Sequence, residues 1–251
     1  MRQLLTAAVC FLFACAAHAE LADTIARIKP SVVVVGTFNK LRSPAFMMRG
    51  TGFAIGDGSL IATNSHVVPE AAGADGLDTP MVMARTGGEN RPRVVRLLAR
   101  DAEHDLALLR MDGPALPALA LRASDTVREG QAVAFTGFPI GGALGFSPVT
   151  HRGIVSSITP IALPGGNAGN LRETSIRRLR GGAFPIFQLD ATAYPGNSGG
   201  PLFDVETGEV IGILNMVFVK ESKEAVLEKP SGISYAIPSR HLIELLDKIG
   251  P

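Results

Sequence analysis

The sequence predicts an all-β protein in two halves, with a short helix at each end. Short apolar runs alternate with glycine- and proline-rich turns, as where the turn Gly56-Asp57-Gly58 joins the runs 50–55 and 60–63. Residues 113–127, which contain Pro114 and Pro117 and little alternation, separate two groups of such runs. The chain has 251 residues, enough for two barrels of about 100 residues each.

The first half is predicted to span residues 20–112. Apolar residues at helical spacing, followed by Pro30, predict a helix over residues 21–29. Strands are expected over residues 31–36, 50–55, 60–63, 81–84, 94–99 and 106–111, and residues 41–49 are expected to form a loop. Residues 113–127 are expected to be the linker between the two halves.

The second half is predicted to span residues 128–251. Strands are expected over residues 131–135, 154–158, 186–189, 202–203, 210–219 and 233–237. A final helix follows, in which Ser239 is expected to be the N-cap and Leu242, Leu245, Leu246 and Ile249 the buried face.

Residues 1–19 have the pattern of a signal peptide. Arg2 precedes an apolar run over residues 4–15, and Ala17-His18-Ala19 is a small-x-small cleavage site. Both cysteines, Cys10 and Cys15, lie in this segment, so cleavage leaves a chain without disulfides. The pattern predicts a periplasmic or secreted protein. Cys15 leaves lipidation open as an alternative, although Phe13 fits a lipoprotein processing site poorly.

The composition excludes some function classes. Lysine and arginine number 24 against 23 acidic residues, so no basic field favours nucleic acid as a partner. Charged residues make up 19% of the chain and hydrophobic residues 46%, which indicates a folded core. His151 and His241 are lone, and no cysteine, histidine or carboxylate residues cluster at metal-ligand spacing, so no metal site and no cofactor are predicted.

One loop carries the strongest chemical signal. Ser198 lies between glycines in the stretch YPGNSGGPL, residues 194–202. Glycine permits tight turns and close backbone approach. Such a loop can present a hydroxyl together with N–H groups that stabilise the oxyanion of acyl transfer.

A base and an orienting acid occur upstream of that loop. His66 ends an apolar run in TNSHVV, and Asp105 begins another in HDLALLR. The order His, Asp, Ser is one of the chain orders known for this catalytic triad. His66 and Asp105 lie in the first half and Ser198 in the second, so the site is expected between the halves.

These stretches resemble trypsin-like (chymotrypsin-fold) serine endopeptidases of the HtrA/Deg type. Further matching stretches are TGFPIG at 136–141, GIVSSI at 153–158, GEVIGIL at 208–214 and ISYAIPS at 233–239. The resemblance covers nearly all of the chain after residue 30. It implies an all-β fold of two six-stranded antiparallel β-barrels, and no cofactor.

The resemblance also implies roles for individual residues. His66 would be the general base, Asp105 would orient it, and Ser198 would be the nucleophile. The backbone N–H groups of Gly196 and Ser198 would form the oxyanion hole.

The resemblance places the substrate pocket near Thr192, Ala193, Leu214 and Met216. None of these residues is acidic, so we expect cleavage after a small or medium apolar residue rather than after arginine or lysine.

The resemblance implies an unfolded or damaged protein or peptide as substrate, and it leaves a homotrimer open. Members of this type commonly continue into PDZ domains after the final helix, and no PDZ domain is expected in this chain. Two alternatives remain: a processing protease dedicated to one partner, and a non-enzymatic chaperone or binding scaffold. Residues 164–184 are rich in arginine and predict a solvated loop, with a regulatory or oligomer-contact role as the alternative.

Overall fold

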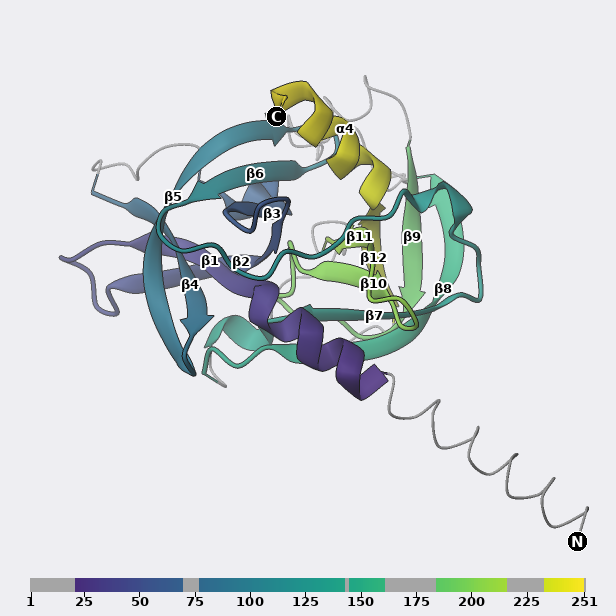
Figure 1. Cartoon of the computed structure of the whole chain (residues 1–251), viewed down its shortest axis with the longest axis horizontal. Coiled ribbons are helices and arrows are strands. Elements are labelled where there is room, and N and C mark those ends of the chain that lie inside the picture. Colours follow the sequence, from purple (N-terminus) through teal and green to yellow (C-terminus); the bar gives the residue numbers. More distant parts are fainter. Residues whose placement is uncertain (1–20, 70–76, 143–144, 161–183, 216–232, 251) are drawn as a thin grey trace, which may run out of the picture.

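The computed structural model describes residues 21–69, 77–142, 145–160, 184–215 and 233–250. Its strands close into two antiparallel barrels of six strands each, with one helix before the first barrel and one after the second (Figure 1). The predicted fold class is therefore confirmed. The signal peptide, Met216 and nearly all of the arginine-rich segment lie outside the described residues.

The first barrel has the strand order β1-β2-β3-β6-β5-β4. A helix over residues 21–28 and a 3₁₀ turn, η1 (Lys29–Ser31), precede it. The strands are β1 (Val32–Phe38), β2 (Phe46–Ile55), β3 (Leu60–Asn64), β4 (Thr79–Thr86), β5 (Glu89–Asp101) and β6 (Leu106–Met111), with the 3₁₀ turn η2 (Ser65–Val67) after β3.

Three of these strands are longer than the sequence indicated. The predicted loop 41–49 is partly wrong, because β2 begins at Phe46, which pairs with Phe38 of β1. Strands β4 and β5 extend to Thr86 and Glu89, which pair across their turn. The ends of β4 and β5 at this turn are exposed, so they carry no apolar alternation, and backbone pairing alone defines them.

The second barrel has the order β10-β11-β12-β9-β8-β7. Its strands are β7 (Ala132–Gly137), β8 (Val149–Pro160), β9 (Pro185–Asp190), β10 (Pro201–Asp204), β11 (Val210–Leu214) and β12 (Ile233–Pro238). The 3₁₀ turns η3 (Ser124–Thr126) and η4 (Pro139–Gly142) flank β7. Between the barrels the chain forms isolated bridges to both, Leu119 to Ile55 and Leu121 to Val210.

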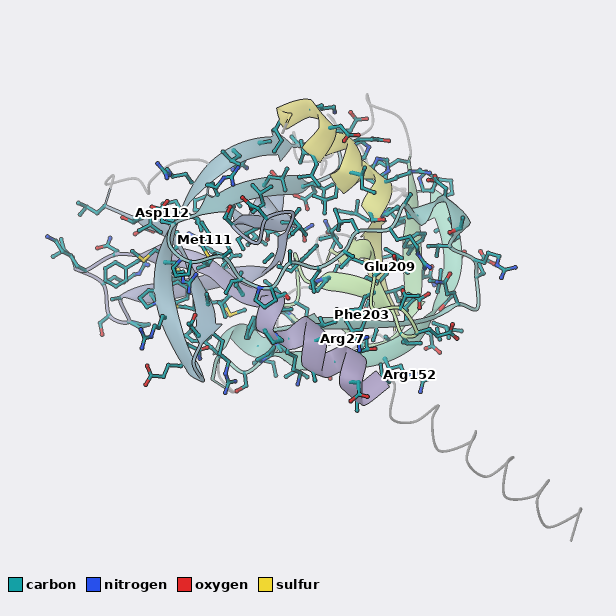
Figure 2. The ribbon with its side chains drawn as sticks, in the orientation of Figure 1. Arg27, Met111, Asp112, Arg152, Phe203 and Glu209 are labelled. Carbon is teal, nitrogen blue, oxygen red and sulfur yellow. The ribbon has the colours of Figure 1, made fainter. Side chains whose placement is uncertain are left out.

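Each barrel has its own core, and a third apolar cluster joins them. Val33 and Leu109 belong to the core of the first barrel, and Phe135 and Leu189 to that of the second. The joining cluster contains residues from both barrels and from the C-terminal helix, among them Phe53, Leu108, Phe203, Ile213 and Leu242. Figure 2 shows Met111 at the end of β6 in one barrel and Phe203 on β10 in the other. The shared cluster fixes how the two barrels face each other.

The C-terminal helix α4 (Ser239–Ile249) packs across both barrels (Figure 1). Leu242 and Leu245 are buried, as its periodicity predicts. Ser239 is not the N-cap, which corrects the prediction: Pro238 occupies that position. The Ser239 hydroxyl instead donates to the carbonyl oxygen of Arg122, so it ties the helix to the segment between the barrels. Among the described residues, no helix is both long enough and apolar enough to cross a bilayer.

Two histidines connect α4 to the first barrel. The His241 ring stacks on His104 with 3.8 Å between centroids, and Phe184 contacts both rings edge-on. Asp101 accepts from Nδ1 of His104 at 2.7 Å. Arg240 Nε donates to Nε2 of His241, and a Glu244 oxygen lies 3.4 Å from Nδ1 of His241. Burial, followed by the charges of His104 and Arg240, lowers the pKa of His241 to about 4, although Glu244 acts in the opposite direction.

This histidine is expected to make folding sensitive to acid. Between the unfolded pKa near 6.5 and the folded value near 4, the unfolded chain binds a proton that the folded chain does not, so stability falls as pH decreases through that range. The loss from His241 should reach about 2 kcal/mol between pH 7 and pH 5. Urea unfolding of the chain carrying Ser198→Ala, which avoids self-cleavage, measures it. Adding His241→Phe keeps a ring on His104 and should remove most of this dependence; an unchanged dependence would contradict the assignment.

Candidate active site

The turn η2 brings His66 to the end of β3. Its Nδ1 lies 2.7 Å from Oδ2 of Asp105, and its backbone N–H donates to Oδ1 of the same carboxylate at 2.9 Å. The carbonyl oxygen of Asp105 accepts from the Ser65 N–H at 2.9 Å and from the Asn64 side chain at 3.1 Å. Asp105 therefore fixes both the imidazole and the backbone that carries it.

Asp105 lies in the turn between β5 and β6 and is almost fully buried, with 3% of its surface exposed. Its φ of 55° is in the left-handed region, which aspartate tolerates better than most residues. Burial alone would raise the pKa of Asp105. The hydrogen bond and charge of His66, the Asn215 side chain and the His66 N–H outweigh burial, so the pKa lies below its ordinary value. The carboxylate is thus ionised at neutral pH.

Asn215 is a site residue that the sequence analysis missed. It follows β11 in the second barrel and is fully buried, and its Nδ2 donates to Oδ2 of Asp105 at 2.7 Å. The Oδ2 atom therefore receives one bond from His66 and one from the other barrel. The position lies between Leu214 and Met216, two residues predicted for the substrate pocket, and no local pattern indicates that its partner lies 110 residues away.

The loop that carries Ser198 is anchored to the first barrel by Thr51 of β2. The Thr51 N–H donates to the Ser198 carbonyl oxygen at 2.8 Å, and its hydroxyl donates to the Gly196 carbonyl oxygen at 2.7 Å. The N–H of Phe138 donates to the same hydroxyl at 3.1 Å. The sequence predicts Thr51 only as part of the strand over residues 50–55, and its anchoring role emerges from these contacts.

Gly50 shows that the Ser198 loop lies beside the turn that carries His66. A Cβ placed on Gly50 would be 2.7 Å from the Val67 side chain and 2.8 Å from the Ser198 carbonyl oxygen. The nucleophile loop and η2 therefore meet across one glycine. The His66 side chain is partly exposed, with 32% of its surface accessible to solvent. Ser198 is buried, with 5% of the surface of the residue exposed.

Three backbone N–H groups around Ser198 have acceptors within the protein. Those of Asn197, Gly199 and Gly200 donate to the carbonyl oxygens of Tyr194, Leu214 and Asn197, and so hold the loop together. The Pro195 carbonyl oxygen accepts from the Ile140 N–H at 2.8 Å. Because N–H and C=O lie on opposite sides of a trans peptide, the Gly196 N–H points away from Ile140.

The expected pocket residues lie on neighbouring segments of the second barrel. Thr192 is half-buried after β9. Ala193 and Leu214 are buried and belong to the core of that barrel. Ser234 of β12 joins these segments, since its hydroxyl donates to the Ala191 carbonyl oxygen and accepts from the Ala193 N–H. Met216 lies outside the described residues.

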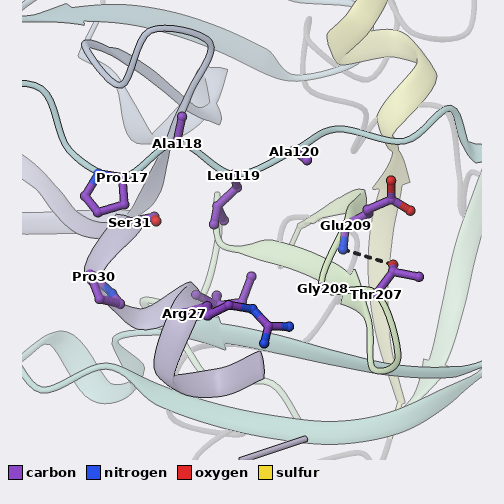
Figure 3. Close-up of a pocket in the computed structure, with 11 residues that line it drawn as sticks. Arg27, Pro30, Ser31, Pro117, Ala118, Leu119, Ala120, Thr207, Gly208 and Glu209 are labelled. Atoms are coloured by element: carbon purple, nitrogen blue, oxygen red, sulfur yellow. Dashed lines mark hydrogen bonds between the residues drawn. The ribbon is translucent and has the colours of Figure 1, made fainter. Parts of the chain in front are cut away.

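One cavity lies away from these residues. It has a volume of about 510 Å³ and lies between Arg27 of the N-terminal helix, the segment from Pro117 to Ala120, and the turn at Thr207 to Glu209 (Figure 3). None of the predicted site residues lines it. Within the described ranges, no three histidine, cysteine or acidic side chains gather as metal ligands.

A comparison with known proteins shows the family to which the chain belongs. The family model of the trypsin-like peptidase domain matches residues 50–213, which include His66, Asp105 and Ser198. The chain belongs to this family.

Curated relatives of the chain are named as DegP-like and HTRA serine proteases. The chain is 32% identical over 200 residues, 80% of its length, to a probable periplasmic serine endoprotease DegP-like protein of Marinomonas sp.. It is 33% identical over 238 residues, 91% of its length, to human serine protease HTRA3. It spans 35% of the first relative and 45% of the second. A solved structure of the HtrA-type protease AlgW with tripeptide is 28% identical, with a TM-score of 0.65, over 91% of this chain and 63% of the other.

Proposed function

We propose that the protein is an exported serine endopeptidase that cleaves unfolded or damaged proteins. The observation that carries the proposal is the hydrogen-bonded array of Asn215, Asp105 and His66 beside the Ser198 loop. A serine hydroxyl is a weak nucleophile at neutral pH and needs an adjacent base. An imidazole held by an ionised, buried carboxylate supplies that base.

The reaction would proceed through an acyl-enzyme. Nε2 of His66 takes the proton from the Ser198 hydroxyl as its oxygen attacks the peptide carbonyl. The Gly196 and Ser198 N–H groups stabilise the oxyanion, and losing one such donor typically costs about 3–4 kcal/mol. The imidazolium then protonates the leaving amine, and the C–N bond breaks. Water, deprotonated by the same imidazole, hydrolyses the ester and restores the serine.

The pocket is proposed to accept a small or medium apolar residue before the cleaved bond. The segments that would form it, at Thr192–Ala193 and Leu214, present no carboxylate that could pair with arginine or lysine. The proposed location is the periplasm, which the predicted signal peptide and the names of the bacterial relatives support. The names also support proteins or peptides as substrates.

The test is degradation of an unfolded, casein-like protein by the mature chain beside Ser198→Ala. We expect cleavage by the parent, at least about 10⁵-fold slower cleavage by the variant, and cut sites after apolar residues. Cuts after arginine or lysine would refute the proposed specificity of the pocket for apolar residues. A narrow set of cut sites would favour a dedicated processing protease. If neither the parent nor Ser198→Ala cleaves the protein, even on heating or with a peptide activator, the proposal that the chain is an endopeptidase is wrong. Holding of unfolded protein by both would then favour a binding scaffold.

A further inference from the structure

A second residue of the β5–β6 hairpin reaches the turn that carries His66. Arg100 is the penultimate residue of β5 and pairs with Ala107 of β6. Asp105 lies in the turn between these strands. The hairpin therefore delivers two side chains to η2, the Asp105 carboxylate and the Arg100 guanidinium.

The guanidinium of Arg100 spans η2 from one end to the other. Nη1 donates to the Ser65 carbonyl oxygen at 3.2 Å and to the Ser65 hydroxyl at 3.1 Å. Nη2 donates to the carbonyl oxygens of Val68 at 3.2 Å and of Pro69 at 3.4 Å. His66 lies between the two contacted ends.

These contacts add to the bonds that the turn makes with itself. The Val68 N–H donates to the Ser65 carbonyl oxygen at 3.1 Å, and the Asn64 side chain forms no cap bond to the turn. The Asp105 carboxylate accepts from the His66 N–H, and the Asp105 backbone carbonyl oxygen accepts from the Ser65 N–H. Arg100 binds carbonyl oxygens of Ser65, Val68 and Pro69, so the two residues hold opposite polar groups of the same segment.

We propose that Arg100 is a positioning residue for His66. It contacts no reacting atom and acts by fixing the backbone on which the imidazole is mounted. Arginine suits this role because its guanidinium is rigid, planar and permanently charged, and its fork can bind two groups at once. The inference rests on the proposed function, because the geometry it preserves is that of the proposed base.

The test compares Arg100→Gln with Arg96→Gln. Arg96 lies on the same strand, but it is exposed and its ion pair goes to Asp112, so its variant removes one charge without touching η2. We expect Arg100→Gln to lower kcat on a peptide substrate by about 10- to 100-fold, the scale of a small misplacement of a catalytic group, with KM changed less than about threefold. Arg96→Gln should keep the parent values. Parent-like kcat in Arg100→Gln, or a loss that only follows the amount of folded protein, would overturn the inference.

A spectroscopic readout works without substrate. The proton on Nδ1 of His66, in a short bond to Asp105, should resonate far downfield in the NMR spectrum of the chain carrying Ser198→Ala. We expect Arg100→Gln to weaken or shift this signal while the signals of the barrels persist, and Arg96→Gln to preserve it. An unchanged signal would overturn the inference even if kcat fell. If Arg100→Gln does not fold, Arg100→Met, which retains an apolar stem, is measured in the same way.

The two proposals can fail separately. If the parent cleaves and Arg100→Gln cleaves equally well, the endopeptidase stands and only the role of Arg100 is wrong. If the parent does not cleave, the NMR comparison still decides whether Arg100 positions His66.

Discussion

Replacing Asp105 with asparagine is expected to lower kcat by about 10⁴-fold while the fold remains intact. The carboxylate accepts from His66 Nδ1, from the His66 N–H and from Asn215 Nδ2. An amide has one oxygen and one NH₂ group, so it cannot accept at both positions. At the Oδ1 position its NH₂ would face the donor N–H of His66, and at the Oδ2 position it would face the Asn215 donor and donate to Nδ1 of His66. In the second arrangement the imidazole carries its own proton on Nε2, so Nε2 cannot take the proton from Ser198.

The matched control for this prediction is Asp101→Asn. Asp101 is the last residue of β5, immediately before the turn that contains Asp105, and it accepts from Nδ1 of a different histidine, His104, at 2.7 Å. We expect its variant to keep kcat within about threefold, because His104 is outside the triad, although it should be less stable. The rates are measured on a peptide substrate, with folded protein quantified by circular dichroism. Equal losses in both variants would indicate a general effect on the turn rather than a specific role of Asp105.

Replacing Gly199 with alanine is expected to unfold the nucleophile loop or displace it. Gly199 has a φ of +85°, and a Cβ there would be 2.1 Å from the Thr51 carbonyl oxygen and 2.3 Å from the Thr63 hydroxyl. Both atoms belong to the first barrel, so the added methyl would push the barrels apart at the site. We expect destabilisation of about 3 kcal/mol or more, from the left-handed backbone and the overpacking together. We also expect at least a 100-fold loss in kcat/KM.

Gly88→Ala separates the two causes. Gly88, in the turn between β4 and β5, has a similar φ of +87°, but a Cβ there would meet nothing within 4 Å. Its variant should lose only about 1–2 kcal/mol and keep parent kinetics. Urea unfolding and peptide hydrolysis on both variants give the comparison. If Gly199→Ala were no worse than Gly88→Ala, the close approach of the Ser198 loop to β2 and β3 would be wrong.

The sequence alone was sufficient for the elements in which local pattern and burial coincide. The turn Gly56-Asp57-Gly58 between two apolar runs is the β2–β3 hairpin, and residues 106–111 are β6 with the predicted ends. The alternation of these strands, and the periodicity of α4, report directly which face is buried. The sequence also indicated His66, Asp105 and Ser198 as candidates, because a glycine-flanked serine preceded by a histidine and an aspartate in this order is the pattern of a known catalytic triad. Whether they perform catalysis remains a prediction.

Only the tertiary structure decided which distant groups face each other. Asn215 meets Asp105 because the shared apolar cluster sets the end of β11 against the first barrel. Arg100 meets η2 because β5, β6 and β3 are neighbours in the closed barrel, and its exposed surroundings on β5 give no sign of this partner. The Ser239 hydroxyl bonds to Arg122 rather than capping α4, because the helix docks where that carbonyl oxygen is within reach. Periodicity records that a side chain is buried, whereas the identity of its partner depends on how the barrels close and pack.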